Sequence, residues 1–290
     1  MEYADQSTQG AGETQGFLTP PIDEQPAFPT GMALLRRVPF LVSQLILYLV
    51  MFQVYKMARK EFIPPDPSIA YDHAKAVLNF ESRLGLMFEL DLQQWVLDRG
   101  DWLIHFFNNV YANYMWGFHF GMLFLALMSP GRYRYMRRAF FISMAIATPM
   151  YLIYPLAPPR FMSDHGWPFM DTLAVYGPNY FSDTGLVTAN RFAAMPSMHV
   201  GWTTFFAICI MLGCPNRKLG IAIMSFLTVL ITLTVMVTGN HYWMDAVGGW
   251  LVIGSAIVIN RYVPYPLLER WRQRNNVPEP QVDSRHSATL

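Results

Sequence analysis

The stretch that decides the fold runs from Phe192 to Asn260 and reads FAAMPSMHVGWTTFFAICIMLGCPNRKLGIAIMSFLTVLITLTVMVTGNHYWMDAVGGWLVIGSAIVIN. Its only charged residues are Arg217, Lys218 and Asp245. Long uncharged runs are typical of helices that cross a bilayer, because a charge at the membrane centre is costly. The stretch predicts three successive spans: Met198–Pro215, Leu219–Thr238 and Tyr242–Asn260.

The rest of the chain repeats this pattern. Of its 290 residues 53% are hydrophobic and 14% are charged, whereas about 25% are charged in soluble domains. Three more uncharged runs, Val38–Tyr55, Trp102–Met128 and Ala139–Pro158, are long enough to cross a bilayer. We therefore expect an all-α fold, a polytopic membrane helical bundle of about six transmembrane helices.

The chain is expected to have three parts. Residues 1–35 are polar and rich in Gly, Gln, Thr and Pro, which predicts a disordered cytoplasmic tail and no signal peptide. Residues 36–264 are expected to form the membrane domain, and residues 265–290 a second cytoplasmic tail. Within the domain, Ile69–Trp102 has helical apolar spacing interrupted by charges, which favours interfacial amphipathic helices.

Basic residues predict the orientation. The segment Ser129–Arg138 contains four arginines and no acidic residue, so it is expected to be a cytoplasmic loop. Other basic residues fall on the same predicted side: Arg36, Arg37, Arg217, Lys218, Arg270, Arg272 and Arg274. Both termini are then cytoplasmic, and a bacterial plasma membrane is the expected location. In a Golgi-type membrane the same topology would place the outer face in the lumen.

Three polar clusters fall on the predicted outer face, at span ends that are far apart in the sequence. They are Ala157–Arg160, Pro196–His199 and His241–Asp245. Residues four apart on a helix share a face, so Asp245 can hydrogen-bond one ring nitrogen of His241 and leave the other free to attack. His199 has the near-neutral pKa suited to protonating a leaving oxygen.

The same face is suited to an anion. Arg160 offers a guanidinium fork that matches phosphate oxygens, and Arg191 adds a second if its loop folds back. Ser197 is either a phosphate ligand or the N-cap of the next helix. The N-termini of the fourth and sixth spans also point N–H groups at this face. Phosphate is the natural ligand.

These residues resemble the phosphatidic acid phosphatase type 2 (PAP2) superfamily, and most closely its inositol phosphorylceramide synthase branch. The family motif Pro-Ser-Gly-His corresponds to Pro196-Ser197-Met198-His199, and the His and Asp of its third motif match His241 and Asp245. By this resemblance His241 is the nucleophile that becomes a phosphohistidine, Asp245 orients it, and His199 is the acid for the leaving group.

The chain also departs from the family motifs. Ile153 stands where the first motif has Lys, and Phe161 follows Arg160 where that motif has Pro. Thr234 and Val235 replace the Ser and Arg of the third motif. Two phosphate-binding cations are therefore missing, and Arg191 is the candidate to replace one of them.

Three classes of function are compatible with this pattern. The first is a metal-independent lipid phosphatase or phosphotransferase that acts on a lipid phosphate or phospholipid at the headgroup plane, without a cofactor. The second is a metal enzyme, because His199, His241 and Asp245 also count as two His and one carboxylate. The third is a transporter or scaffold that binds headgroups without turnover. A net charge of +1 argues against a nucleic-acid partner.

Overall fold

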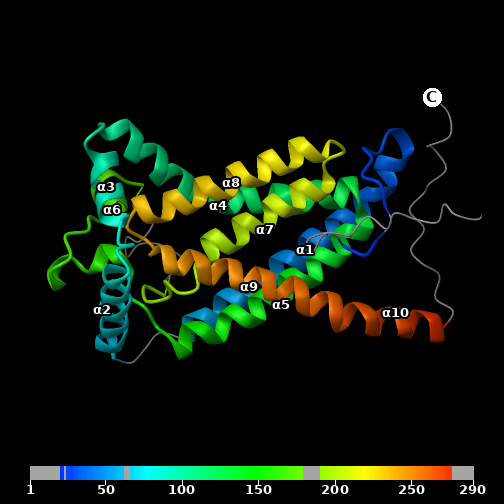
Figure 1. Ribbon diagram of the computed structural model, residues 1–290. Helices are drawn as coiled ribbons and strands as arrows, with labels where there is room; N and C mark the ends of the chain where they lie inside the picture. Colours follow the sequence, from blue (N-terminus) through cyan, green and yellow to red (C-terminus); the bar gives the residue numbers. More distant parts are fainter. Residues whose placement is uncertain (1–19, 23, 62–65, 179–189, 276–290) are drawn as a thin grey trace, which may run out of the picture.

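A computed structural model describes residues 20–22, 24–61, 66–178 and 190–275, and this part of the chain is helical (Figure 1). Its elements are α1 (Gly31–Glu61), α2 (Pro67–Arg83), α3 (Glu89–Leu97), α4 (Asp101–Met128), α5 (Pro130–Ile153), the 3-10 turns η1 (Pro159–Phe161) and η2 (Ser163–His165), α6 (Thr172–Tyr176), α7 (Met198–Gly213), α8 (Arg217–Val237), α9 (Trp243–Tyr262) and α10 (Pro264–Arg274). The all-helical fold class is confirmed.

Helix α7 lies at the centre of the bundle and packs against α4, α8 and α9, while α5 packs along α9. Its aromatic side chains Trp202, Phe205 and Phe206 are buried in the largest hydrophobic core together with residues of α4 and α5. The short helices α2, α3 and α6 gather at one end of the bundle, and α10 extends from the other (Figure 1).

Each of the six predicted spans overlaps a helix, namely α1, α4, α5, α7, α8 and α9, although α5 ends at Ile153 and not at Pro158 as expected. Three described segments are long and apolar enough to cross a membrane: Gly31–Tyr55, Arg217–Val237 and Trp243–Arg274. The apolar segments His119–Met128 and Met198–Gly213 are shorter. The structure thus supports membrane helices, and the count of six stays a prediction.

The segment Ser129–Arg138 is the clearest local difference from the sequence analysis. We expected a loop, but α5 begins at Pro130 and contains all four arginines. The buried carboxylate of Glu24 explains the early start, because its Oε2 accepts hydrogen bonds from Ser129 Oγ and the N–H of Gly131. Pro130 also suits the first turn, where its missing N–H costs nothing. A cap contributed from more than 100 residues away leaves no local pattern.

The expected peripheral segments are helical where the structure describes them. Helices α2 and α3 occupy the predicted interfacial segment, although two of their acidic residues, Glu81 and Glu89, are fully buried. Helix α1 begins inside the range expected for the first tail, and α10 occupies part of the second. The remaining parts of the two expected tails (1–35 and 265–290), residues 1–19 and 276–290, lie outside the described residues.

Candidate active site

The three polar clusters meet at the end of the bundle where α7 and α9 begin. His199 lies in the first turn of α7, and Asp245 in the first turn of α9. His241 lies in the link between α8 and α9, and Arg160 in the turn η1. The prediction that these four residues converge from distant parts of the chain agrees with the geometry.

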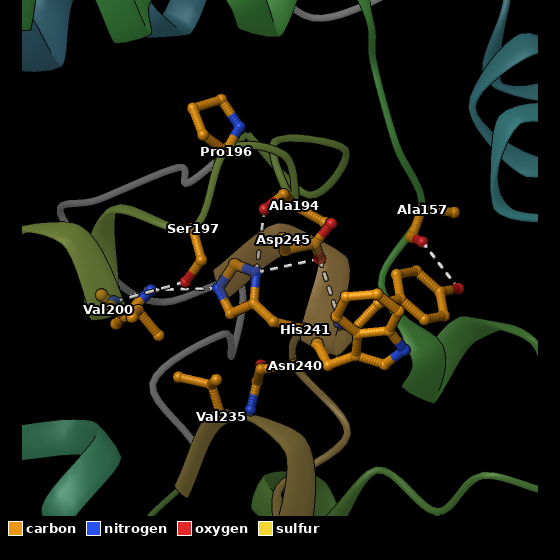
Figure 2. A network of polar contacts seen from close by, with 12 residues as sticks. Ala157, Ala194, Pro196, Ser197, Val200, Val235, Asn240, His241 and Asp245 are labelled. Atoms are coloured by element: carbon orange, nitrogen blue, oxygen red, sulfur yellow. Dashed lines mark hydrogen bonds and ion pairs between the residues drawn. The ribbon is translucent and has the colours of Figure 1, made fainter. Parts of the chain in front are cut away.

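His241 is held by two acceptors on one side of its ring (Figure 2). Its Nδ1 lies 2.9 Å from the carbonyl oxygen of Ala194 and 3.3 Å from Oδ2 of Asp245. A carbonyl oxygen can only accept a hydrogen bond, so Nδ1 must carry the proton in this arrangement. Nε2 of the neutral ring is then the nitrogen with a free electron pair.

His199 faces that nitrogen. Its Nδ1 lies 3.2 Å from Nε2 of His241. Because Nε2 is the acceptor, Nδ1 of His199 is the donor. The ring of His199 is also stacked on Tyr111, with centroids 4.4 Å apart, and contacts Tyr114 at 4.2 Å. The two histidines thus share one proton between them, in a site lined on one side by aromatic rings of α4.

The N-terminus of α9 is occupied by carboxylates of the protein itself. Oδ2 of Asp245 accepts a hydrogen bond from the N–H of Tyr242, and Oε1 of Glu89 accepts one from the N–H of Trp243. We expected these N–H groups to face a phosphate, and that expectation was wrong for these two. Glu89 was missed because it lies 154 residues earlier in the chain.

Ser197 is fully buried and caps α7, with its Oγ 3.4 Å from the N–H of Val200. Of the two interpretations open from the sequence, the structure supports the N-cap. Direct contact between Ser197 and a phosphate stays an untested prediction. The N–H of Ser197 also donates to the carbonyl of Asp245 at 2.9 Å. This bond ties the start of α7 to the first turn of α9.

Glycines allow α7 and α9 to approach closely enough for this contact. A Cβ atom at Gly249 would lie 2.3 Å from the carbonyl oxygen of Ser197, and one at Gly201 would lie 3.0 Å from the carbonyl oxygen of Gly249. Both clashes are with backbone, which cannot move aside as a flexible side chain can. The pair Gly248-Gly249 in an apolar helix is a sequence signal for such a crossing.

Arg160 is buried at the edge of the site. Its guanidinium donates a hydrogen bond to Oδ1 of Asn240, and its Nε lies 3.5 Å from Oδ2 of Asp171. The backbone N–H of Arg160 donates to the carbonyl of Gly239. Burial lowers the pKa of Arg160 and so does Arg191, whereas Tyr111 and Asp171 raise it. A guanidinium stays protonated at neutral pH despite such shifts. Asn240, which immediately precedes His241, was missed in the sequence.

Arg191 lies close enough to act electrostatically on Arg160. Its loop is joined to the segment after α5 by a parallel bridge between Leu156 and Ala193. The same loop supplies the carbonyl of Ala194 that holds His241. The loop therefore does fold back toward the site, as the interpretation of Arg191 required.

The positions that depart from the family motifs carry no cation and lie in different surroundings. Ile153 ends α5 and is 69% exposed, while Thr234 and Val235 are fully buried. The carbonyl of Val235 accepts hydrogen bonds from the N–H groups of Asn240 and His241. Val235 thus helps to shape the link that presents His241, through its backbone alone.

His199, His241 and Asp245 do not converge on a single point. His241 stands between the other two, with His199 at Nε2 and Asp245 at Nδ1. Within the ranges that the structure describes, no group of three His, Cys, Asp or Glu side chains could hold a metal ion.

A family model described as "PAP2 superfamily" matches residues 75–259, which is more than half of the chain. The match begins in α2, ends in α9 and includes every residue of the candidate site. No curated protein and no solved structure matched the chain.

Proposed function

The chain belongs to the PAP2 superfamily, and from this premise we propose that it is an integral-membrane phosphatase or phosphotransferase that acts on a lipid-linked phosphate. Membership suggests a phosphatase-type function. The observation that carries the finer proposal is the ordered pair of histidines, in which Nε2 of His241 is the acceptor and Nδ1 of His199 the donor. A nucleophile and a proton donor are thus adjacent before substrate binds.

In the first half-reaction, Nε2 of His241 attacks the phosphorus atom. The N–P bond forms, and the bond from phosphorus to the leaving oxygen breaks. His199, which enters this step as an imidazolium with both ring nitrogens protonated, gives its Nδ1 proton to that oxygen and becomes neutral. The 3.2 Å contact between the two rings must open to admit the phosphate. Asp245 stabilises the positive charge that develops on His241, as the carboxylate of a triad does.

In the second half-reaction, the neutral His199 takes a proton from water or from a lipid hydroxyl as its oxygen attacks phosphorus. The N–P bond breaks and His241 is restored. Water releases phosphate, while a lipid hydroxyl receives the phosphate or headgroup phosphate. Arg160 and Arg191 stabilise the negative charge of the phosphate oxygens throughout, and Ser197 holds the start of α7 and with it His199.

The test measures phosphate and headgroup release by purified protein in detergent with EDTA. The substrates are phosphatidic acid, prenyl pyrophosphates, and phosphatidylinositol with a lipid alcohol. Turnover and an acid-labile, alkali-stable phosphoenzyme should vanish in His241→Ala and persist in His105→Ala, a control in the exposed part of α4. Activity that survives His241→Ala contradicts the mechanism. Loss of activity in EDTA favours a metal enzyme, and lipid binding without a phosphoenzyme favours a scaffold.

We also propose six spans, two cytoplasmic termini and an extracytoplasmic site. Helix α10 lies at the end of the bundle opposite to the helices α2, α3 and α6 (Figure 1). The arginine-rich start of α5 lies near the C-terminal end of α7, where Arg132 donates to the carbonyl of Leu212, whereas His199 lies at the start of α7. This distribution of arginines in α5 and α10 supports the orientation. In a protein lacking Cys209 and Cys214, Asp164→Cys should react with an impermeant maleimide on intact cells. Arg274→Cys should react only after lysis. The reverse pattern contradicts the orientation.

A further inference from the structure

Two glutamates lie buried behind the start of α9, outside the residues that touch the phosphate in the proposed reaction. Glu81 lies near the end of α2 and Glu89 is the first residue of α3, and both side chains have no exposed surface. In the part of the chain that the structure describes, neither carboxyl forms a salt bridge. Two fully buried acids without a basic partner are costly, so their presence calls for a reason.

Glu89 contacts the turn that carries the catalytic residues. Its Oε1 lies 2.9 Å from the N–H of Trp243, the first residue of α9. The positive end of a helix favours a carboxylate there. Asp245 lies two residues further along the same turn and contacts both His241 and the N–H of Tyr242. A displacement of this turn would move the ring of His241 relative to His199.

The charges around Glu81 do not allow every carboxyl to be ionised. Glu89 and Asp245 face it from α3 and α9, Tyr242 faces it from the N-cap of α9, and Tyr154 at the end of α5 faces Asp245. The basic side chain His241 contacts Asp245 of this group, and neither glutamate forms a salt bridge in the described part of the chain. Ionisation of both glutamates would place like charges together out of water. The pair must therefore keep a proton.

The pKa shifts of Glu81 and Glu89 agree with this geometry. Burial, followed by the charges of Glu89 and Asp245, raises the pKa of Glu81 to about 9. Burial also raises the pKa of Glu89, while the N–H of Trp243 lowers it. Because Glu89 accepts a hydrogen bond from the helix N–H of Trp243, it is the member suited to carry the negative charge, and Glu81 is the member suited to keep the proton.

We propose that Glu89 and Glu81 are positioning residues for the reaction at His241. Glu89 holds the first turn of α9 by accepting a hydrogen bond from the N–H of Trp243. An ionised Glu81 would repel the carboxylate of Glu89, so this contact is kept only while Glu81 carries its proton. The inference rests on the proposed function for its kinetic consequences. Its structural part, the retained proton, does not depend on catalysis.

The first experiment compares two replacements of Glu89. Glu89→Gln keeps an oxygen that can accept from Trp243, whereas Glu89→Leu has similar volume and no acceptor. Glu89→Leu should lower kcat about 10- to 100-fold with little change in KM, and Glu89→Gln should restore most of kcat. Equal losses in both variants, or a Glu89→Leu enzyme within twofold of wild type, would overturn the positioning role.

The second experiment uses Glu81→Gln, which mimics the protonated acid at every pH. The ratio of its kcat to that of wild type cancels the titration of His199 and His241, which both proteins share. This ratio should be constant from pH 6 to 8 and rise about tenfold between pH 8 and pH 10, as expected for one proton lost near pH 9. A ratio that stays flat to pH 10 contradicts the inference.

A measurement without substrate separates this inference from the proposed function. The pKa of Glu81 is higher in the folded protein than in an unfolded chain. At pH values between these two pKa values, the folded protein therefore binds one more proton than the unfolded chain. Wild-type stability in detergent should therefore fall relative to Glu81→Gln as pH rises from 5 to 9. Parallel melting curves would refute the retained proton even if the enzyme is active. Diverging curves without turnover would uphold it and reject the enzymatic function.

Discussion

Replacement of Asp245 by Asn tests how His241 is held. In a Ser-His-Asp triad the same change lowers kcat about 10⁴-fold, because the imidazole adopts the wrong tautomer. Here the carbonyl of Ala194 is the closer acceptor for Nδ1, at 2.9 Å against 3.3 Å for Asp245. The carbonyl remains in the variant and still requires a proton on Nδ1, so the correct tautomer should survive.

The loss in Asp245→Asn is then limited to the charged hydrogen bond. Such bonds contribute about 1.5–3 kcal/mol, which corresponds to a fall in kcat of about 10- to 150-fold at nearly constant KM. The assay is initial-rate phosphate release at saturating lipid, with His241→Ala as background and the exposed Asp72→Asn as control. A 10⁴-fold loss would show that the carbonyl of Ala194 does not hold the tautomer. An unchanged kcat would remove Asp245 from the mechanism.

Further predictions concern the helix crossing, the phosphate site and the cap of α5. Gly249→Ala should lower both the melting temperature and activity, because its Cβ meets backbone at 2.3 Å, whereas Gly254→Ala on the same helix meets nothing within 4 Å and should be neutral. Arg191→Ala should raise KM about tenfold, and full activity in this variant would exclude a phosphate-binding role for Arg191. Arg160→Lys should lower kcat, because a lysine cannot reproduce the guanidinium fork. Glu24→Leu should destabilise the fold by about 1–3 kcal/mol in thermal melts, because the donors of Ser129 and the α5 N-terminus lose their acceptor, while kcat stays unchanged.

The sequence was sufficient to place most of the helices and to single out residues that the fold brings together at the candidate site. Uncharged runs are a local property, so each predicted span was found as a helix, with α7, α8 and α9 close to their expected bounds. The spacing of His241 and Asp245 likewise predicted a contact that the structure contains. The convergence of His199 with His241 followed from placing both at the same end of their spans.

Contacts between distant segments could not be predicted in this way. The early start of α5 depends on Glu24, and the occupied N-terminus of α9 depends on Glu89. The carbonyl of Ala194 has no side-chain signature, because any residue at that position would supply it. These contacts arise from the path of the backbone through space, which local periodicity does not record.

By itself, the sequence predicted a helical protein with segments apolar enough to cross a membrane, and it singled out a His-Asp pair and arginines of the kind that bind phosphate. Only the tertiary structure decided which nitrogen of His241 is free, because that depends on the carbonyl of Ala194 in a separate loop. It also decided how closely α7 and α9 approach, because a Cβ at Gly249 would lie 2.3 Å from the backbone of α7's N-cap Ser197, and one at Gly201 would be tight at 3.0 Å. Hydrophobic pattern selects the elements, whereas the geometry of the site is set by contacts between elements that meet only in the folded chain.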